Sequence, residues 1–460
     1  MDYQTILKIS LENTNFYIIK KPITYNDLIT LSTIRVAAMW HKIKLILADP
    51  AKSLWIHPTL GAVFAVVFSL MAKLGGYVLP HDAIPHISVD TLSDLLNIIA
   101  SSMLAVTTFS LSIMVSALAS SSNSATPRAR LLIMADDTAR VAIASFIAAF
   151  IYSVIAKVAL SLEYYGQAGR FILFISTILV LMYIIFTLIR WVHTLSQLGS
   201  LGDALQRIEK VASSTLATYR AQPNLGATHA LPTTAPDFEV LSSATAYISD
   251  LDLAALNDIA ETHQLHVHIP ERPGKFMARD VPVLQVYVQQ ALDADTVTNI
   301  KQQLGACVLQ EANRRYPQDP RLGLLVMSEV GQRAMSAATN DPATAISVLN
   351  ALTRVIVDTQ ASSDDLTEFK HLSISPMDEG AWIESVFAPI ARDSVSNLEI
   401  NQRLLKCLGL IAQHAPEPAL RQAVQDEAEE ILKRCLKNFA EALDQQRIQD
   451  CFDEAFTKTP

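Results

Sequence analysis

Residues 95–128 read LLNIIASSMLAVTTFSLSIMVSALASSSNSATPR, and this stretch decides the class of the protein. It contains no charged side chain before Arg128. A helix that crosses a bilayer needs about 20 predominantly apolar residues. The stretch therefore predicts a transmembrane helix over residues 95–119.

Three other charge-poor runs predict three more membrane helices, at residues 54–73, 141–160 and 171–190. We therefore expect a membrane α-helical fold with four transmembrane helices. Half of the 460 residues are hydrophobic and only 18% are charged, which argues against an ordinary soluble globule. The net charge of −9 argues against a dedicated nucleic-acid-binding protein. We expect the lipid bilayer, and no nucleic acid, as a partner.

The distribution of Lys and Arg predicts how these helices are oriented. The loop near residues 79–94 carries neither residue type, whereas the next loop carries Arg128, Arg130 and Arg140. Cytoplasmic loops are enriched in Lys and Arg. We therefore expect a multi-pass protein of the bacterial inner (cytoplasmic) membrane with both termini in the cytoplasm. Arg128 and Arg130 would then lie at the cytoplasmic mouth of any path between the helices.

Small and hydroxyl-bearing side chains form a stripe along the helix expected at residues 95–119. At about 100° per residue, they fall on one slowly drifting face. One interpretation is tight helix–helix packing, because small residues let two backbones approach closely. The other is a pore or solute path lined by hydroxyl groups. The polar members of this stripe are Ser101, Thr108, Ser112 and Ser116.

The rest of the chain predicts a cytoplasmic α+β region attached to the transmembrane domain, residues 54–195. Residues 1–53 are expected to form a cytoplasmic segment with an amphipathic helix, and residues 196–237 a helical extension and linker. β-Branched residues around an ERPGK turn predict a small β-barrel or β-sandwich at residues 238–292. Apolar residues near a 3.6-residue spacing predict an all-α-helical domain at residues 293–460.

Few side chains suggest a metal site or a buried charge. Lys157 is the only charge inside an expected span, and its place near the outer end predicts that its ammonium reaches the interface. Zinc needs three or four ligands, and the four cysteines form no CxxC pair. We therefore expect no metal and no cofactor. Two histidine-containing clusters are the alternatives. A metal site could form at His263, His266 and His268, and a divalent-cation or proton-sensing site could form in the outer loop at His81, Asp82, His86 and Asp90.

Two turns, Gln318–Asp319 and Asn340–Asp341, are the remaining candidates for chemistry. Two carboxylates held within hydrogen-bond reach of a substrate can perform acid–base catalysis. An Asp directly before a helix more often caps it, and the Pro342 that follows Asp341 suits the first helical position. No Walker A, GxSxG or HExxH pattern occurs. We therefore expect that the protein is not an enzyme.

Two segments carry a resemblance to known sequences. In the first, the small and hydroxyl residues of the helix at 95–119 end in Thr126-Pro127-Arg128, where the related sequences have Ser-Pro-Arg. The second is TAYISDLDLAALNDIAETHQLHVHIPERPGKFM, which resembles a Ser-Gly-Tyr-Val…Ile-Asp…Gly-Asp-Phe pattern. Ala246 stands where Gly is usual, and Lys275 stands where Asp is usual.

A third segment completes the resemblance. Gln318-Asp319 is followed by MSAATNDPATA, which is similar to Ala-Leu-Ser-Pro-Gly-x-Asn-Asp-Pro-x-Thr-Ala. Together the segments resemble a bacterial family of predicted membrane proteins of unknown function, domain of unknown function 2254. The departures make this chain a divergent member. The residues that match in the third segment are Asn340, Asp341, Pro342, Thr344 and Ala345.

The resemblance implies a membrane location but supplies no function. The expected function therefore rests on the residues themselves. We expect an oligomeric channel or transport-type pore with a cytoplasmic gating domain, in which the helices at 95–119 line the path. Four helices leave little room for a path inside one subunit, and oligomers are usually symmetric. The alternative is a membrane-anchored scaffold or sensor that binds a cytoplasmic protein partner, for which a large exposed apolar patch would be the sign.

Overall fold

The computed structural model describes residues 63, 66–67, 85, 87–124, 126–129, 137–197, 201–228, 233–361 and 368–456. The expected N-terminal segment at 1–53 lies outside the described residues, and so does nearly all of the first expected membrane helix at 54–73. The same holds for three residues of the outer-loop cluster and for one candidate mouth residue, namely His81, Asp82, His86 and Arg130.

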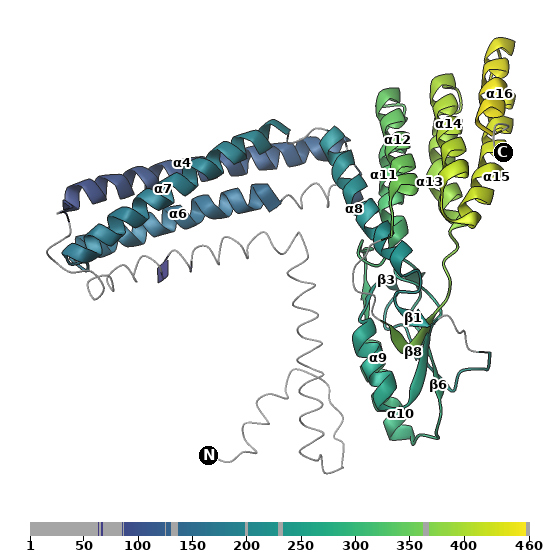
Figure 1. Ribbon diagram of the computed structural model, residues 1–460, viewed down its shortest axis with the longest axis horizontal. Coiled ribbons are helices and arrows are strands. Elements are labelled where there is room, and N and C mark those ends of the chain that lie inside the picture. The colour runs from purple at the N-terminus through teal and green to yellow at the C-terminus, as the bar shows by residue number, and fades with distance from the viewer. Residues whose placement is uncertain are drawn as a thin grey trace. The chain divides into compact units, whose positions relative to one another are not determined.

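Three helices of the described part are long and apolar enough to cross a membrane. They are α4, Val89–Ser124, α6, Asp137–Ser161, and α7, Gln167–Gln197 (Figure 1). Each contains one of the apolar runs that the sequence singles out. Each also extends past its run at both ends, because polar residues continue the helical hydrogen bonding that the apolar residues begin.

Apolar side chains hold these three helices together. Leu92 of α4 shares a buried cluster with Tyr152 of α6 and Leu173 of α7. Further along, Met103 of α4 shares a second cluster with Phe146 of α6, together with residues of α7. The three helices therefore form one bundle with a continuous interior, and α4 contributes one face to it.

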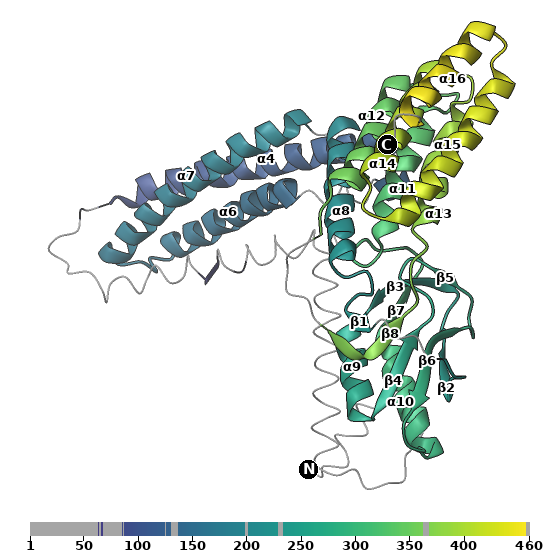
Figure 2. The ribbon, with the colours of Figure 1, turned by 45° about the vertical axis from the view of Figure 1, so that its right-hand side comes forward.

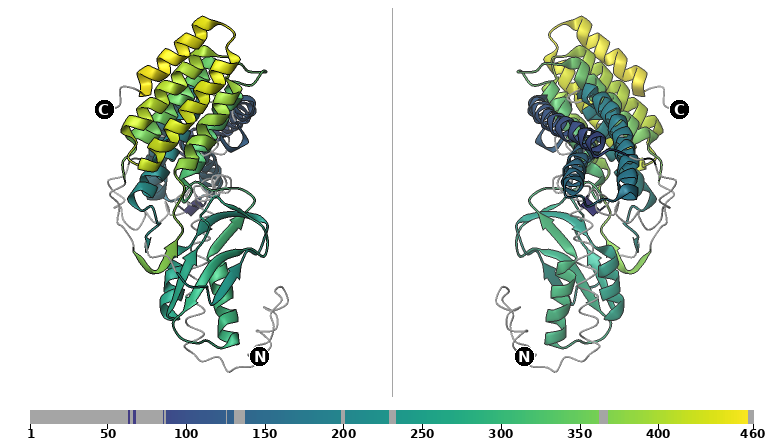
Figure 3. Two further views of the ribbon diagram at one scale, coloured as in Figure 1. Left: turned by 90° about the vertical axis from the view of Figure 1, so that its right-hand side faces the viewer. Right: turned by 90° about the vertical axis from the view of Figure 1, so that its left-hand side faces the viewer.

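The part of the chain after α7, which the sequence leads us to expect as the soluble half, contains a stack of helices in two layers (Figure 3). Helices α11, α13 and α15 contact one another in sequence order, and so do α12, α14 and α16, while α8 packs on α11 and α12. One apolar core runs through the stack. The bounds are α8 Leu201–Ala221, α11 Pro320–Ala334, α12 Pro342–Asp358, α13 Gly380–Asp393, α14 Leu398–His414, α15 Pro418–Asn438 and α16 Ala442–Phe456.

Two sheets make up the β-module (Figure 2). The larger has the strand order β1-β8-β4-β6-β2, and the smaller has the order β5-β3-β7. Helices α9, Leu253–Thr262, and α10, Ala294–Ala306, pack against strands of the module. The strands are β1 Ala227–Thr228, β2 Phe238–Leu241, β3 Ala246–Leu251, β4 Leu265–Ile269, β5 Phe276–Met277, β6 Pro282–Val288, β7 Val308–Glu311 and β8 Phe369–Ile374.

The expectation that residues 293–460 are entirely helical is wrong, because β7 and β8 lie in this range. Strand β8 pairs in parallel with β4 and fills a position inside the larger sheet. The larger sheet is open, with β1 and β2 at its edges, so the described strands form no closed barrel. Local periodicity could not reveal this, because β8 reaches its partners only after the chain has passed through α11 and α12.

Candidate functional site

Helix α4 buries one side in the bundle. Leu96, Ile99 and Met103 are buried there. Further along the same side, Ser110 is fully buried, and its Oγ accepts a hydrogen bond of 2.8 Å from Nε1 of Trp191 on α7. A serine in an apolar interior needs such a partner, and the indole N–H has no other role than that of a donor. This bond fixes which face of α4 points inward.

The stripe predicted from the sequence lies on the opposite side of α4. Ser101 precedes Ser110 by nine residues, which places the two roughly 180° apart around the helix. All four polar members of the stripe are exposed, so the described helices α6 and α7 do not cover it. Large apolar side chains, Leu104 and Phe109 among them, are exposed on its two flanks. The exposed stripe residues are Ser101, Thr108, Ser112 and Ser116.

Two hydroxyl groups of the stripe, those of Ser101 and Thr108, donate hydrogen bonds to their own helix. Ser101 Oγ donates to the carbonyl oxygen of Asn97 at 2.8 Å, and Thr108 Oγ1 donates to that of Ala105 at 2.9 Å. A hydroxyl group has one hydrogen and two acceptor lone pairs. Because the hydrogen is used within the helix, these two oxygens present acceptor character outward.

Lys157 lies next to one end of the stripe. Its Nζ on α6 donates to Oδ1 of Asn97 on α4 at 3.0 Å. Asn97 is one helical turn before Ser101. The ammonium group therefore has a polar partner on the neighbouring helix, at the exposed surface of the bundle, a contact that the sequence did not suggest. The available signal for this contact was Asn97 itself, a polar side chain within the apolar run at residues 95–119.

The segment that follows α4 contacts the soluble half. Arg128 forms an ion pair with Glu329 of α11. Its neighbour Ala129 is fully buried in the same apolar cluster as Ile208 of α8 and Val330 of α11. Pro127 is exposed. The candidate mouth residue Arg128 is thus engaged by a carboxylate of the soluble helices.

A second ion pair lies close to the first. Asp319, only 2% exposed, accepts hydrogen bonds from Arg314 Nε at 2.7 Å and Arg314 Nη2 at 2.6 Å. Burial raises the pKa of Asp319, and the guanidinium opposes this shift. Burial also raises the pKa of the phenol of Tyr316, on which both ion pairs act electrostatically. Tyr316 therefore lies within electrostatic range of both ion pairs.

The turn at Gly274, which belongs to the β-module, packs against Asp319. Gly274 has φ +93°, a left-handed conformation that favours glycine. A Cβ atom there would lie 2.2 Å from Asp319 Oδ2. The neighbouring Gln318 amide bonds both backbone atoms of Leu251, accepting from N–H and donating to C=O at 2.9 Å each. Sequence reasoning missed Arg314, Glu329 and Gly274; the Pro-Gly dipeptide was a signal for the turn alone.

The carboxylates of the two candidate turns do not meet. Asp319 directly precedes α11, whereas the backbone N–H of Asp341 donates to the carbonyl of Ala334, the last residue of α11. The 15-residue helix separates them by about 22 Å. Asp341 caps α12, accepting from Thr344 N at 3.1 Å and from Thr344 Oγ1 at 2.6 Å. These bonds lower the pKa of Asp341.

Asn340 and Pro342 complete this helix start. Asn340 adopts φ +44°, which a short polar side chain tolerates, and Pro342 occupies the first position of α12.

Two histidines of β4 lie within hydrogen-bond distance of the same serine. His266 Nε2 and His268 Nδ1 lie 2.8 and 3.0 Å from Ser373 Oγ on β8. Burial lowers the pKa of both imidazoles. His263 lies apart from them, as the C-cap of α9. Within the described ranges, no group of three or more His, Cys, Asp or Glu residues is placed to hold a metal ion.

A comparison with known families shows to which family the chain belongs. The family model described as "Predicted membrane protein (DUF2254)" matches residues 51–409. The chain belongs to this family. Uncharacterised proteins of Mycobacterium tuberculosis strain H37Rv and Mycobacterium bovis are 30% identical to it over 141 residues, 29% of this chain and 27% of theirs. The matched stretch spans about a quarter of the length of these relatives. No solved structure matches the chain.

All three family-like segments of this DUF2254 member contribute a residue to the ion pairs of Arg128 and Asp319 or to the packing against them. Arg128 comes from the first segment, Gly274 from the second and Asp319 from the third. They lie far apart in the sequence and approach one another only in the folded chain. Gly274 packs closely against Asp319, while Arg128 and Asp319 form their ion pairs with Glu329 and Arg314, which lie outside the three segments. These contacts suit the joining of the segment after α4 to α11 and of α11 to the β-module.

Proposed function

We propose that this membrane protein is not an enzyme and that it forms oligomers in which the stripes of α4 line a path for water and small ions. The observation that carries the proposal is the exposure of the four hydroxyl side chains, directly opposite the buried Ser110. Small residues in membranes let helices of neighbouring subunits approach. A symmetric ring of α4 helices would bring the stripes together around one axis.

The chemistry of the stripe favours water and cations over anions. The hydroxyl hydrogens of Ser101 and Thr108 are used within α4, so their lone pairs face outward. Pores that replace the hydration shell of a cation use oxygen atoms of this kind. The stripe has no fixed charge of its own, and selectivity would therefore be modest.

Regulation would come from the soluble half. Arg128 and Ala129, a few residues after the end of α4, are held by the ion pair with Glu329 and by the core of α8 and α11. A movement of α11 would therefore reach the end of α4 through this short segment. We assign the soluble helices and the β-module the role of a gating domain.

Cysteine labelling tests the pore. Single cysteines replace Ser101, Thr108, Ser112 and Ser116 in a background without the native cysteines Cys307, Cys407, Cys435 and Cys451. We expect a water-soluble thiol reagent to label these positions in reconstituted protein and to reduce its conductance. The matched control is Leu111→Cys, whose exposed side chain points roughly 60° or more away from each stripe residue around the helix and should stay unlabelled. If none of the four stripe positions is labelled and the reconstituted membrane does not conduct, the pore is refuted and helix packing is the role of the stripe.

We further infer a bacterial inner-membrane protein with four spans and both termini in the cytoplasm. The Lys and Arg residues of the flanking loops support this orientation. Reporter fusions after residues 90 and 230 provide the test. The first fusion should report an external position and the second a cytoplasmic one, and the reverse result for either would refute the topology.

The absence of an enzymatic role is supported by the two candidate carboxylates. Asp319 is buried in an ion pair and Asp341 caps a helix, with α11 between them. Neither is placed to share a substrate with the other. The scaffold alternative has weaker support, because the exposed large apolar side chains of the described helical stack, Leu410 and Leu443, are single residues on α14 and α16.

A further inference from the structure

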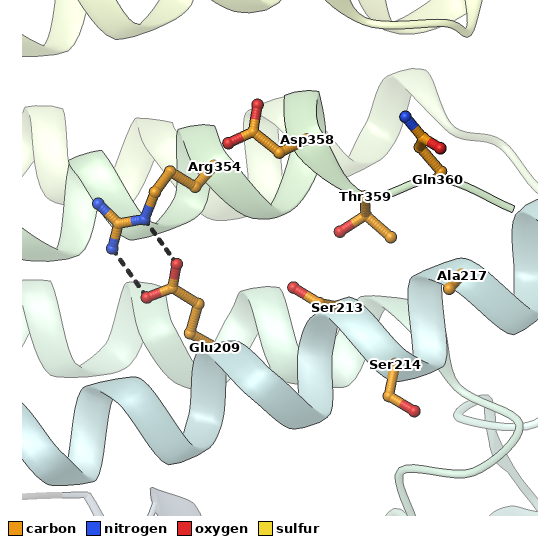
Figure 4. A pocket seen from close by; sticks show the side chains of 8 residues that line it. All are labelled: Glu209, Ser213, Ser214, Ala217, Arg354, Asp358, Thr359 and Gln360. Carbon is orange, nitrogen blue, oxygen red and sulfur yellow. Dashed lines mark hydrogen bonds and ion pairs between the residues drawn. The ribbon is translucent and has the colours of Figure 1, made fainter. Parts of the chain in front are cut away.

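A groove runs along the solvent-facing sides of α8 and α12 (Figure 4). One section of about 580 Å³ is lined by Gln206, Arg207, Glu209, Lys210 and Arg354. A second section of about 420 Å³ shares Glu209 and Arg354 with it and continues toward the C-terminal end of α12. The two sections therefore form one continuous depression.

The first section is basic although the protein is acidic. Its described lining residues include three cations, Arg207, Lys210 and Arg354, and one carboxylate, Glu209. The whole chain, in contrast, carries a net charge of −9. Toward the other end, the lining changes to the hydroxyl groups of Ser213 and Ser214 and then to Asp358 and Thr359, so positive charge is concentrated at one end of the groove.

The opposite side of α8 fixes the direction of these cations. Leu205, Ile208 and Ala212 are buried in the core that α8 shares with α11 and α12. Arg354 reaches across from α12, and its Nε and Nη2 bond the two carboxylate oxygens of Glu209 at 2.7 and 2.8 Å. This pair uses two of the five N–H donors of the guanidinium.

The basic end of the groove is also the end nearer to the membrane along the chain. Helix α8 begins at Leu201, shortly after the apolar helix α7 ends at Gln197. Arg207 and Lys210 lie about 9 and 14 Å along α8 from its first residue, at a rise of about 1.5 Å per residue. The hydroxyl and acidic part of the groove lies further along the same helix.

We propose that this basic section binds the phosphate group of an anionic phospholipid at the surface from which α7 emerges. Guanidinium groups match phosphate oxygens in geometry and charge. Basic residues close to a membrane helix are attracted to anionic lipids. A lipid bound there would bridge α8 and α12 and would stabilise their contact. This inference goes beyond the proposed function and holds whether or not the stripe of α4 conducts ions.

Thermal unfolding of the purified full-length protein in a neutral detergent tests the site. We expect phosphatidylglycerol to raise the unfolding temperature and phosphatidylcholine to leave it unchanged. Lys210→Glu should raise the phosphatidylglycerol concentration needed for half of the shift by about fivefold or more, since each basic residue near a membrane surface contributes about that factor. Glu209→Gln should lower that concentration, because it removes the one carboxylate among the described residues that line the basic section.

A matched control separates the groove from general charge effects. Lys433→Glu makes the same charge change at an exposed position of α15, and it should behave like the unaltered protein. Equal effects of Lys210→Glu and Lys433→Glu would overturn the proposal, as would equal shifts with the two lipids. A shift with inorganic phosphate as large as that with phosphatidylglycerol would also overturn it, in favour of a soluble anion. The opposite directions expected for Lys210→Glu and Glu209→Gln exclude a simple loss of folding as the cause.

Discussion

At the scale of single residues, Gly274 leaves no room for a side chain. An added Cβ would lie 2.2 Å from Asp319 Oδ2, and the backbone has φ +93°. Gly274→Ala should therefore displace the buried Asp319–Arg314 pair and lower the free energy of unfolding by about 2–4 kcal/mol. Chemical unfolding of the purified protein measures this change. Gly305→Ala is the control, since its Cβ would meet only Val240 Cγ1, at 3.5 Å; an equal loss in both variants would contradict the account.

The sequence predicted residue roles wherever the cause was local. Asp341 followed by Pro342 indicated a helix cap, and the cap is present because Thr344 lies three residues away. The partners of Asp319 and Arg128 were not predictable in the same way. Arg314 is near Asp319 in sequence, but the closeness of Gly274 to Asp319 and of Glu329 to Arg128 depends on how distant segments fold together.

At the scale of elements, the contact of α15 with α13 contains a buried carboxyl group that lowers the stability of the fold when it is ionised. Glu427 is buried, and its Oε1 has no hydrogen-bond partner in the described part of the chain. Burial raises the pKa of Glu427 to about 7. In the unfolded chain the carboxyl ionises near pH 4.5, while the folded protein keeps the proton until about pH 7. The folded state therefore binds more protons in this window, and its stability falls as the pH rises through it.

Glu427→Gln tests this pH dependence. The variant should be more stable than the unaltered protein at pH 8, by about 1–2 kcal/mol, because the buried charge is removed. At pH 4 the two should have nearly the same stability, since Glu427 is then protonated in both states. Unfolding midpoints at the two pH values measure the difference. Glu429→Gln, an exposed position of the same helix, should change stability little at either pH; a pH-independent gain for Glu427→Gln would refute the explanation.

At the scale of the whole molecule, the apolar runs predicted the membrane helices α4, α6 and α7. A run of about 20 apolar residues matches the thickness of the hydrocarbon core of a bilayer, so its length alone indicates a spanning helix. The division of the soluble half was not predictable in this way. The expected module at residues 238–292 contains β2 to β6, but β1, β7 and β8 come from outside it. Pairing between strands so far apart leaves no periodic signal in either segment.

This topology predicts that the soluble half folds as one unit. Without β8, the strand β4 would lose its parallel neighbour, and the buried Leu372 and Ile374 would be missing from the core of the module. A fragment of residues 238–292 should therefore show a largely unfolded circular dichroism spectrum. A fragment of residues 201–456, which contains β1 to β8 and α8 to α16, should be folded and should unfold in a single cooperative transition. Cooperative unfolding of the short fragment would show that its strands need no help from the helical stack, and two separate transitions in the long fragment would show that β8 does not couple the two parts.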